Sequence, residues 1–68
     1  MIFEKIKNES VKQNKKISAI EKEAGLGNGV IGGWRTSSPN VKSLKAVADV
    51  LGVSVDFLIA DEREMKEQ

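Results

Sequence analysis

The chain has 68 residues with 11 Lys or Arg and 10 Asp or Glu, so its formal net charge is +1. It contains no Cys and no His, which excludes disulfides, thiolate or imidazole metal sites and Ser-His or Cys-His catalysis. No apolar run approaches the roughly 18 residues of a membrane span, and the first residues lack the layout of a signal peptide. We therefore expect one small cytoplasmic domain that is not an enzyme, has no cofactor and contacts no membrane.

A first helix is predicted over residues 2–13, because Phe3 and Ile6 lie on one face and good helix formers separate them. Glu9 and Ser10 stand where the apolar stripe would continue. We therefore expect this helix to be partly exposed, with a poorly fixed end.

A second helix is predicted over residues 18–24. Ser18 and Glu21 have the spacing of a capping box, in which the Ser accepts from a backbone N–H and the Glu reaches back to the cap. Gly25 follows where a left-handed residue ends a helix without steric cost. The three charged residues at 21–23 are expected on the outer surface of this helix.

A third helix is predicted over residues 28–36, because apolar residues recur at helical spacing after the turn. These residues are Val30, Ile31 and Trp34. Three glycines lie in the same stretch, namely Gly29, Gly32 and Gly33. Each glycine costs roughly 0.5 to 1 kcal/mol relative to Ala, so the helix depends on packing against the core. Two helices joined through a glycine turn form a helix-turn-helix unit.

The fourth predicted helix has the most regular apolar stripe in the chain. It begins after Asn40, a good N-cap residue, and runs to Leu51, with Gly52 at the position of a left-handed C-terminal residue. Ser54 then caps a short fifth helix that closes the core. The sequence therefore predicts an all-α domain of five helices.

Three stretches in this pattern resemble the Cro/C1-type helix-turn-helix family of phage and bacterial repressors. They are Glu-Ala-Gly-Leu at residues 23–26, Trp-Arg-Thr-Ser-Ser-Pro at residues 34–39 and Leu-Gly-Val-Ser-Val-Asp-Phe-Leu at residues 51–58. The resemblance implies a compact, lambda-repressor-like DNA-binding domain over residues 1–60, with its third helix in the major groove of double-stranded DNA. Residues 61–68 follow as a polar, acidic tail.

Charge is distributed unevenly along the chain. Residues 1–45 hold nine Lys or Arg and four Asp or Glu, a balance of +5, whereas residues 46–68 hold two and six, a balance of −4. A basic front half suits a protein that presents one face to phosphate groups. An ordinary solvated surface is the alternative interpretation.

Six polar residues are candidates for contact with DNA: Lys16, Asn28, Arg35, Thr36, Ser37 and Ser38. An Asn amide can bond adenine, an Arg can bond guanine or phosphate, and Lys, Thr and Ser more often bond phosphate. Four of the candidates also have a purely structural interpretation. Lys16 can be a solvated loop residue, Asn28 a helix cap, and the run from Ser37 to Pro39 a turn.

Two functions fit these patterns. The first is a transcriptional regulator that binds operator DNA, with a second copy of the chain as its partner in a homodimer. The second is a modulator or antirepressor of the same fold, which binds a repressor protein and alters its DNA binding. Glycines at 32 and 33, where relatives carry long polar side chains, favour the second function because glycine offers nothing to a base edge. Glutamates on the second helix favour it too, because phosphates repel them.

Overall fold

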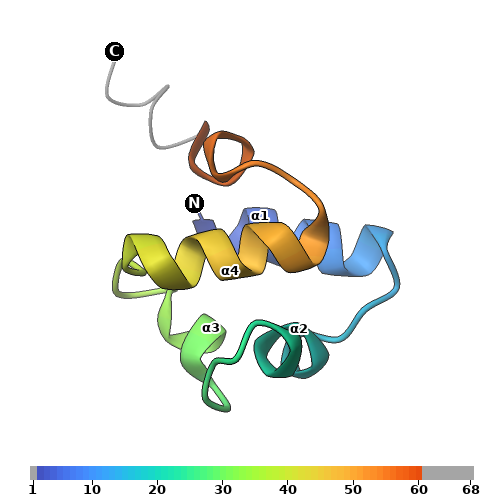
Figure 1. Ribbon diagram of the computed structural model, residues 1–68, viewed down its shortest axis with the longest axis horizontal. Coiled ribbons are helices and arrows are strands. Elements are labelled where there is room, and N and C mark those ends of the chain that lie inside the picture. The colour runs from blue at the N-terminus through green and yellow to red at the C-terminus, as the bar shows by residue number, and fades with distance from the viewer. Residues whose placement is uncertain (1, 61–68) are drawn as a thin grey trace.

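The computed structural model describes residues 2–60, which form five helices and contain no strand (Figure 1). The first four helices are α1 (Ile2–Lys12), α2 (Ile17–Glu23), α3 (Val30–Gly33) and α4 (Val41–Leu51). Residues 55–60 form the fifth helix. In the view of Figure 1, α2 and α3 lie on one side of α4 and the fifth helix lies on the other. The predicted all-α class with five helices is confirmed, and the predicted tail, residues 61–68, lies outside the described part of the chain.

A single hydrophobic core joins all five helices. The segment that begins with α3 contributes Ile31 and Trp34, which are both buried. The other core residues are Phe3 and Ile6 from α1, Ile20 from α2, Leu44, Val47, Ala48 and Leu51 from α4, and Leu58 from the fifth helix. Burial of a side chain of this size contributes about 1.5 to 3 kcal/mol, so each short helix is stabilised mainly by this core.

The two ends of α4 are formed as the sequence predicts. The side chain of Asn40 accepts a hydrogen bond from the backbone N–H of Ser43 at 2.7 Å. Gly52 ends the helix in the left-handed region, with a φ of 72°. Ser54 caps the fifth helix, because its hydroxyl oxygen accepts from the backbone N–H of Phe57 at 3.0 Å.

The start of α2 differs from the prediction. The helix begins at Ile17, and its N-cap residue, Lys16, makes no side-chain capping bond. Ser18 therefore lies inside the helix, and the expected capping box between Ser18 and Glu21 does not form. Glu21 is also not on the outer surface, since only 3% of it is exposed. Gly25 follows the helix with a φ of 76°, as expected.

Two polar residues of α1, Glu9 and Ser10, are buried, whereas Val11 and Lys12 at the end of the helix are exposed, as expected. The Ser10 hydroxyl donates to the carbonyl oxygen of Lys7 at 2.7 Å. Glu9 accepts from Gln13 Nε2 at 3.1 Å, and the same amide nitrogen donates to the carbonyl oxygen of Leu51 at 2.7 Å. Burial is tolerated because these groups have hydrogen-bond partners, and the Gln13 bond ties the end of α1 to the end of α4.

The third helix is shorter than predicted, with four residues rather than nine. Gly29 occupies its N-cap position with a φ of 87°, a left-handed conformation that stops the helix from extending back to Asn28. After Gly33 the chain tightens, because the N–H groups of Trp34 and Thr36 bond carbonyl oxygens three residues earlier, at 3.0 and 3.2 Å. Such i→i+3 bonds are typical of a helix end.

None of the helices between residues 2 and 60 has the length and apolar character needed to cross a membrane.

Candidate nucleic-acid interface

Helices α2 and α3 are joined by the short segment 24–29. Its fold is fixed near Leu26, whose backbone N–H donates to the carbonyl oxygen of Glu21 at 2.8 Å and whose side chain packs against the core. Because the segment is short and held at this point, α3 has a defined position against α2. The two helices are thus packed together through a short connection that contains Gly25, Gly27 and Gly29.

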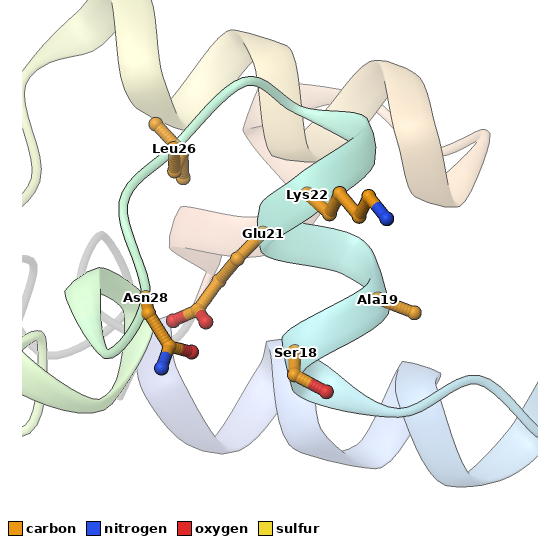
Figure 2. Close-up of a pocket in the computed structure, with 6 residues that line it drawn as sticks. All are labelled: Ser18, Ala19, Glu21, Lys22, Leu26 and Asn28. Atoms are coloured by element: carbon orange, nitrogen blue, oxygen red, sulfur yellow. The ribbon is translucent and has the colours of Figure 1, made fainter.

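Glu21 joins the two helices through its carboxylate. Its Oε1 atom accepts from the backbone N–H of Gly29 at 3.1 Å, and its Oε2 atom accepts from that of Ile31 at 2.8 Å. Figure 2 shows this side chain reaching from α2 toward the turn that carries Asn28. The N-cap residue of α3 is a glycine and has no side chain to accept these bonds. Glu21 therefore caps α3 from the neighbouring helix.

Glu21 is the residue that sequence reasoning missed. An N-cap side chain normally satisfies the N–H groups two or three residues after it. Here the acceptor lies eight and ten residues before its donors. The signal in the sequence is that glycines, which have no side chain to accept a hydrogen bond, occupy positions 27 and 29 before this helix.

Both glutamates of α2 have partners, and only Glu23 lies at the surface. Glu21 is buried and bonded, and Glu23 lies 3.4 Å from the ammonium group of Lys15. The expectation that the charged residues 21–23 all lie outside is therefore wrong for Glu21. The expected repulsion between this helix and phosphates is correspondingly weaker.

The outer surface of α3 and its turn carries few side chains. Between Gly27 and Gly33, Ile31 is buried and every other residue is exposed. A Cβ atom added at Gly29, Gly32 or Gly33 would meet nothing within 4 Å. At these three positions, no neighbouring atom is close enough to exclude a larger residue. Only at Gly29 does the backbone favour glycine, because its φ is positive.

Asn28 lies in an open groove of about 440 Å³ between α2 and the turn. The groove is lined by Ser18, Ala19, Glu21, Lys22, Leu26 and Asn28, all drawn in Figure 2. The side chain of Asn28 makes no hydrogen bond within residues 2–60. Its predicted alternative role as a cap of α3 is therefore not realised.

Four of the candidate residues, 35–38, lie together after α3 in a second groove, next to Trp34 and Ile2. The guanidinium of Arg35 lies over the ring of Phe3, 4.6 Å from its centroid. The Ser37 hydroxyl donates to the carbonyl oxygen of Gly33 at 3.0 Å, and the Thr36 hydroxyl makes a longer bond to the same oxygen. Those two hydroxyl donors are already used by the turn, which favours a structural role for them.

Lys16 lies apart from the other candidates. It is exposed at the start of α2, in a hollow shared with Val11, Asn14 and Lys15. In Figure 1 this segment and the segment after α3 lie at opposite ends of α4. The structure thus places the six candidates at three positions, with Asn28 in the turn and the others in the segments before α2 and after α3.

Comparisons with protein-family models, with curated proteins and with solved structures found no match to this chain.

Proposed function

We propose that the protein is a small transcriptional regulator with a lambda-repressor-like fold, which binds operator DNA as a dimer. The turn and α3 would enter the major groove, and the segments at Lys16 and at Arg35 would contact phosphates on either side. Two observations support this function: the short turn that joins α2 to α3, and the exposed polar groups at these three positions.

The observation that carries the proposal is the double hydrogen bond of Glu21. It holds α3 in place against α2, and it removes a carboxylate from the surface that would face the phosphates. Lys22 lines the groove beside Asn28, so a cation stands next to the turn. The polar surface around the turn is therefore better suited to an anionic partner than the sequence alone indicates.

A second candidate function is that of a modulator which binds a repressor protein. One observation favours it: Gly32 and Gly33 are exposed and face open space, so this part of α3 has no side chain to read a base. A bare helix face also allows the backbone of a protein partner to approach closely.

Binding to DNA tests the two candidates directly. The purified protein is titrated by fluorescence anisotropy against the intergenic DNA upstream of its gene and against a scrambled duplex, at about 50 and 200 mM salt. Direct regulation predicts a dissociation constant below the micromolar range on the specific duplex only, with affinity that falls steeply as salt rises. Weak and equal binding to both duplexes would reject it and favour the modulator.

Substitution of Arg35 tests its part in the interface. Arg35→Ala is expected to weaken DNA binding, by about 1 to 3 kcal/mol if the residue reads a base, or to reduce the salt slope by about 1 if it contacts a phosphate. Lys5→Ala is the matched control. Lys5 lies 4.6 Å from the ring centroid of Phe57 in the fifth helix, so this variant also loses a cation and a ring contact. Equal affinities of the two variants would remove Arg35 from the interface.

A further inference from the structure

The exposed surface from Gly27 to Gly33 carries very few side chains. Four of the seven residues are glycines, and Ile31 is completely buried. Only Asn28 and Val30 extend outward from this stretch. If the turn and α3 enter the major groove, no other side chain of the stretch is available to contact base edges.

The backbone that presents Asn28 is fixed, but its side chain is unengaged. On its C-terminal side, the Gly29 N–H is held by the buried Glu21 carboxylate at 3.1 Å. The Asn28 amide itself has no hydrogen-bond partner among residues 2–60. A primary amide offers one acceptor and one donor group side by side, which matches the N6 and N7 atoms of adenine in the major groove.

Val30 has an apolar side chain that is not part of the hydrophobic core. It is 36% exposed, whereas the adjacent Ile31 is fully buried. Its β-branched side chain is stiff, so its methyl groups keep a defined position on the helix surface. In the major groove, the one apolar group that a base pair presents is the 5-methyl group of thymine.

The Asn28 amide therefore matches adenine and the Val30 methyl groups match thymine, the two bases of an A·T pair. The cation at Lys22, in the same groove as Asn28, and the withdrawal of Glu21 from the surface favour DNA over an apolar protein face as the occupant. We infer that Asn28 and Val30 determine the sequence specificity of this protein, Asn28 by bonding adenine and Val30 by contacting thymine methyl groups. This inference rests on the proposed function, and it identifies sites with A·T pairs under the turn as the preferred DNA.

The test uses the full chain and the tightest duplex selected from a randomised pool. Each thymine is replaced in turn by deoxyuridine, which removes only the 5-methyl group and keeps the base pair. For at least one position we expect affinity to fall about fourfold, the effect of losing one buried methyl-sized group. With Val30→Ala, the same replacement is expected to have no further effect. Alanine favours a helix more than valine does, so this variant retains its fold.

Two further variants complete the test. Asn28→Ala is expected to reduce the preference for A·T over G·C at one position at least about fivefold. Val11→Ala, an equivalent substitution at an exposed position of α1, is expected to keep the full response to deoxyuridine. If no duplex binds better than a scrambled one, the proposed function itself fails. If a duplex binds specifically but deoxyuridine and both interface variants change nothing, the proposed function stands and this inference is overturned.

Discussion

Helices α3 and α4 reach their conformations in different ways. Helix α4 has eleven residues, a side-chain cap from its own Asn40 and a left-handed glycine at its end. Helix α3 has four residues, including two glycines, and no side-chain cap from its own N-cap residue. It is held by the Glu21 carboxylate of α2 and by the buried side chain of Ile31.

The difference shows where the information for each element lies. The residues that start, fill and stop α4 are contained in its own sequence, so its local preferences agree with its place in the fold. The local preferences of α3 oppose a helix, and tertiary contacts overcome them. Elements of this kind are expected where a sequence is constrained by function as well as by stability. The segment with the weakest local preferences is the one proposed to contact DNA.

The largest expected effect comes from removing the capping group of α3. Glu21→Ala leaves the N–H groups of Gly29 and Ile31 without their acceptors, and we expect a loss of about 3 kcal/mol in the free energy of unfolding. Urea denaturation followed by circular dichroism measures it. Glu23→Ala, in the same helix, loses only an exposed ion pair and is expected to cost less than about 1 kcal/mol. Equal losses would show that the Glu21 bonds add nothing to stability.

A smaller effect is expected from the cap of α4. Asn40→Ala removes the hydrogen bond to the Ser43 N–H and is expected to cost about 1 kcal/mol in the free energy of unfolding. Asn28→Ala makes the same chemical change next to α3, where the side chain caps nothing, and is expected to cost under about 0.5 kcal/mol. The same denaturation experiment compares the pair. The interpretation of α4 as locally capped would be wrong if both variants had the same stability.

The smallest effect has the opposite sign. Gly32→Ala and Gly33→Ala place a methyl group in open space within or at the end of α3. Each is expected to raise the free energy of unfolding by about 0.5 to 1 kcal/mol, because alanine loses less backbone entropy on folding. Gly29→Ala is expected to lower it, since its φ of 87° strains any other residue. Thermal unfolding of the three variants checks the signs, and destabilisation by all three would contradict the open space around Gly32 and Gly33.

The parts of the fold that the sequence predicts are those set by neighbouring residues. The Asn40 and Ser54 caps act three residues away, and the left-handed Gly25 and Gly52 stand directly after the helices that they end. The burial of Trp34 follows from its helical spacing after Ile31 in the same way. Such short-range rules are visible in one sequence.

The parts that sequence reasoning missed depend on contacts between elements. Glu21 bonds backbone N–H groups, which every residue except proline has, so no residue type at the partner position marks the contact. The burial of Glu9 was missed for a similar reason. Its partner Gln13 also donates to a backbone carbonyl oxygen, at the C-terminal end of α4. At the candidate site, the residue types of Thr36 and Ser37 predict hydroxyl donors but not that the Gly33 carbonyl already accepts from them.

The position of Arg35 over Phe3 has a consequence for the entropy of binding. A free arginine side chain has about 2 kcal/mol of rotamer entropy to lose when a partner immobilises it. Here the guanidinium already lies on an aromatic ring that belongs to the core. Part of that ordering therefore occurs when the protein folds, before Arg35 meets any partner. If Arg35 contacts DNA as proposed, Phe3 would contribute to the affinity from inside the domain, by limiting the conformations of the free Arg35 side chain.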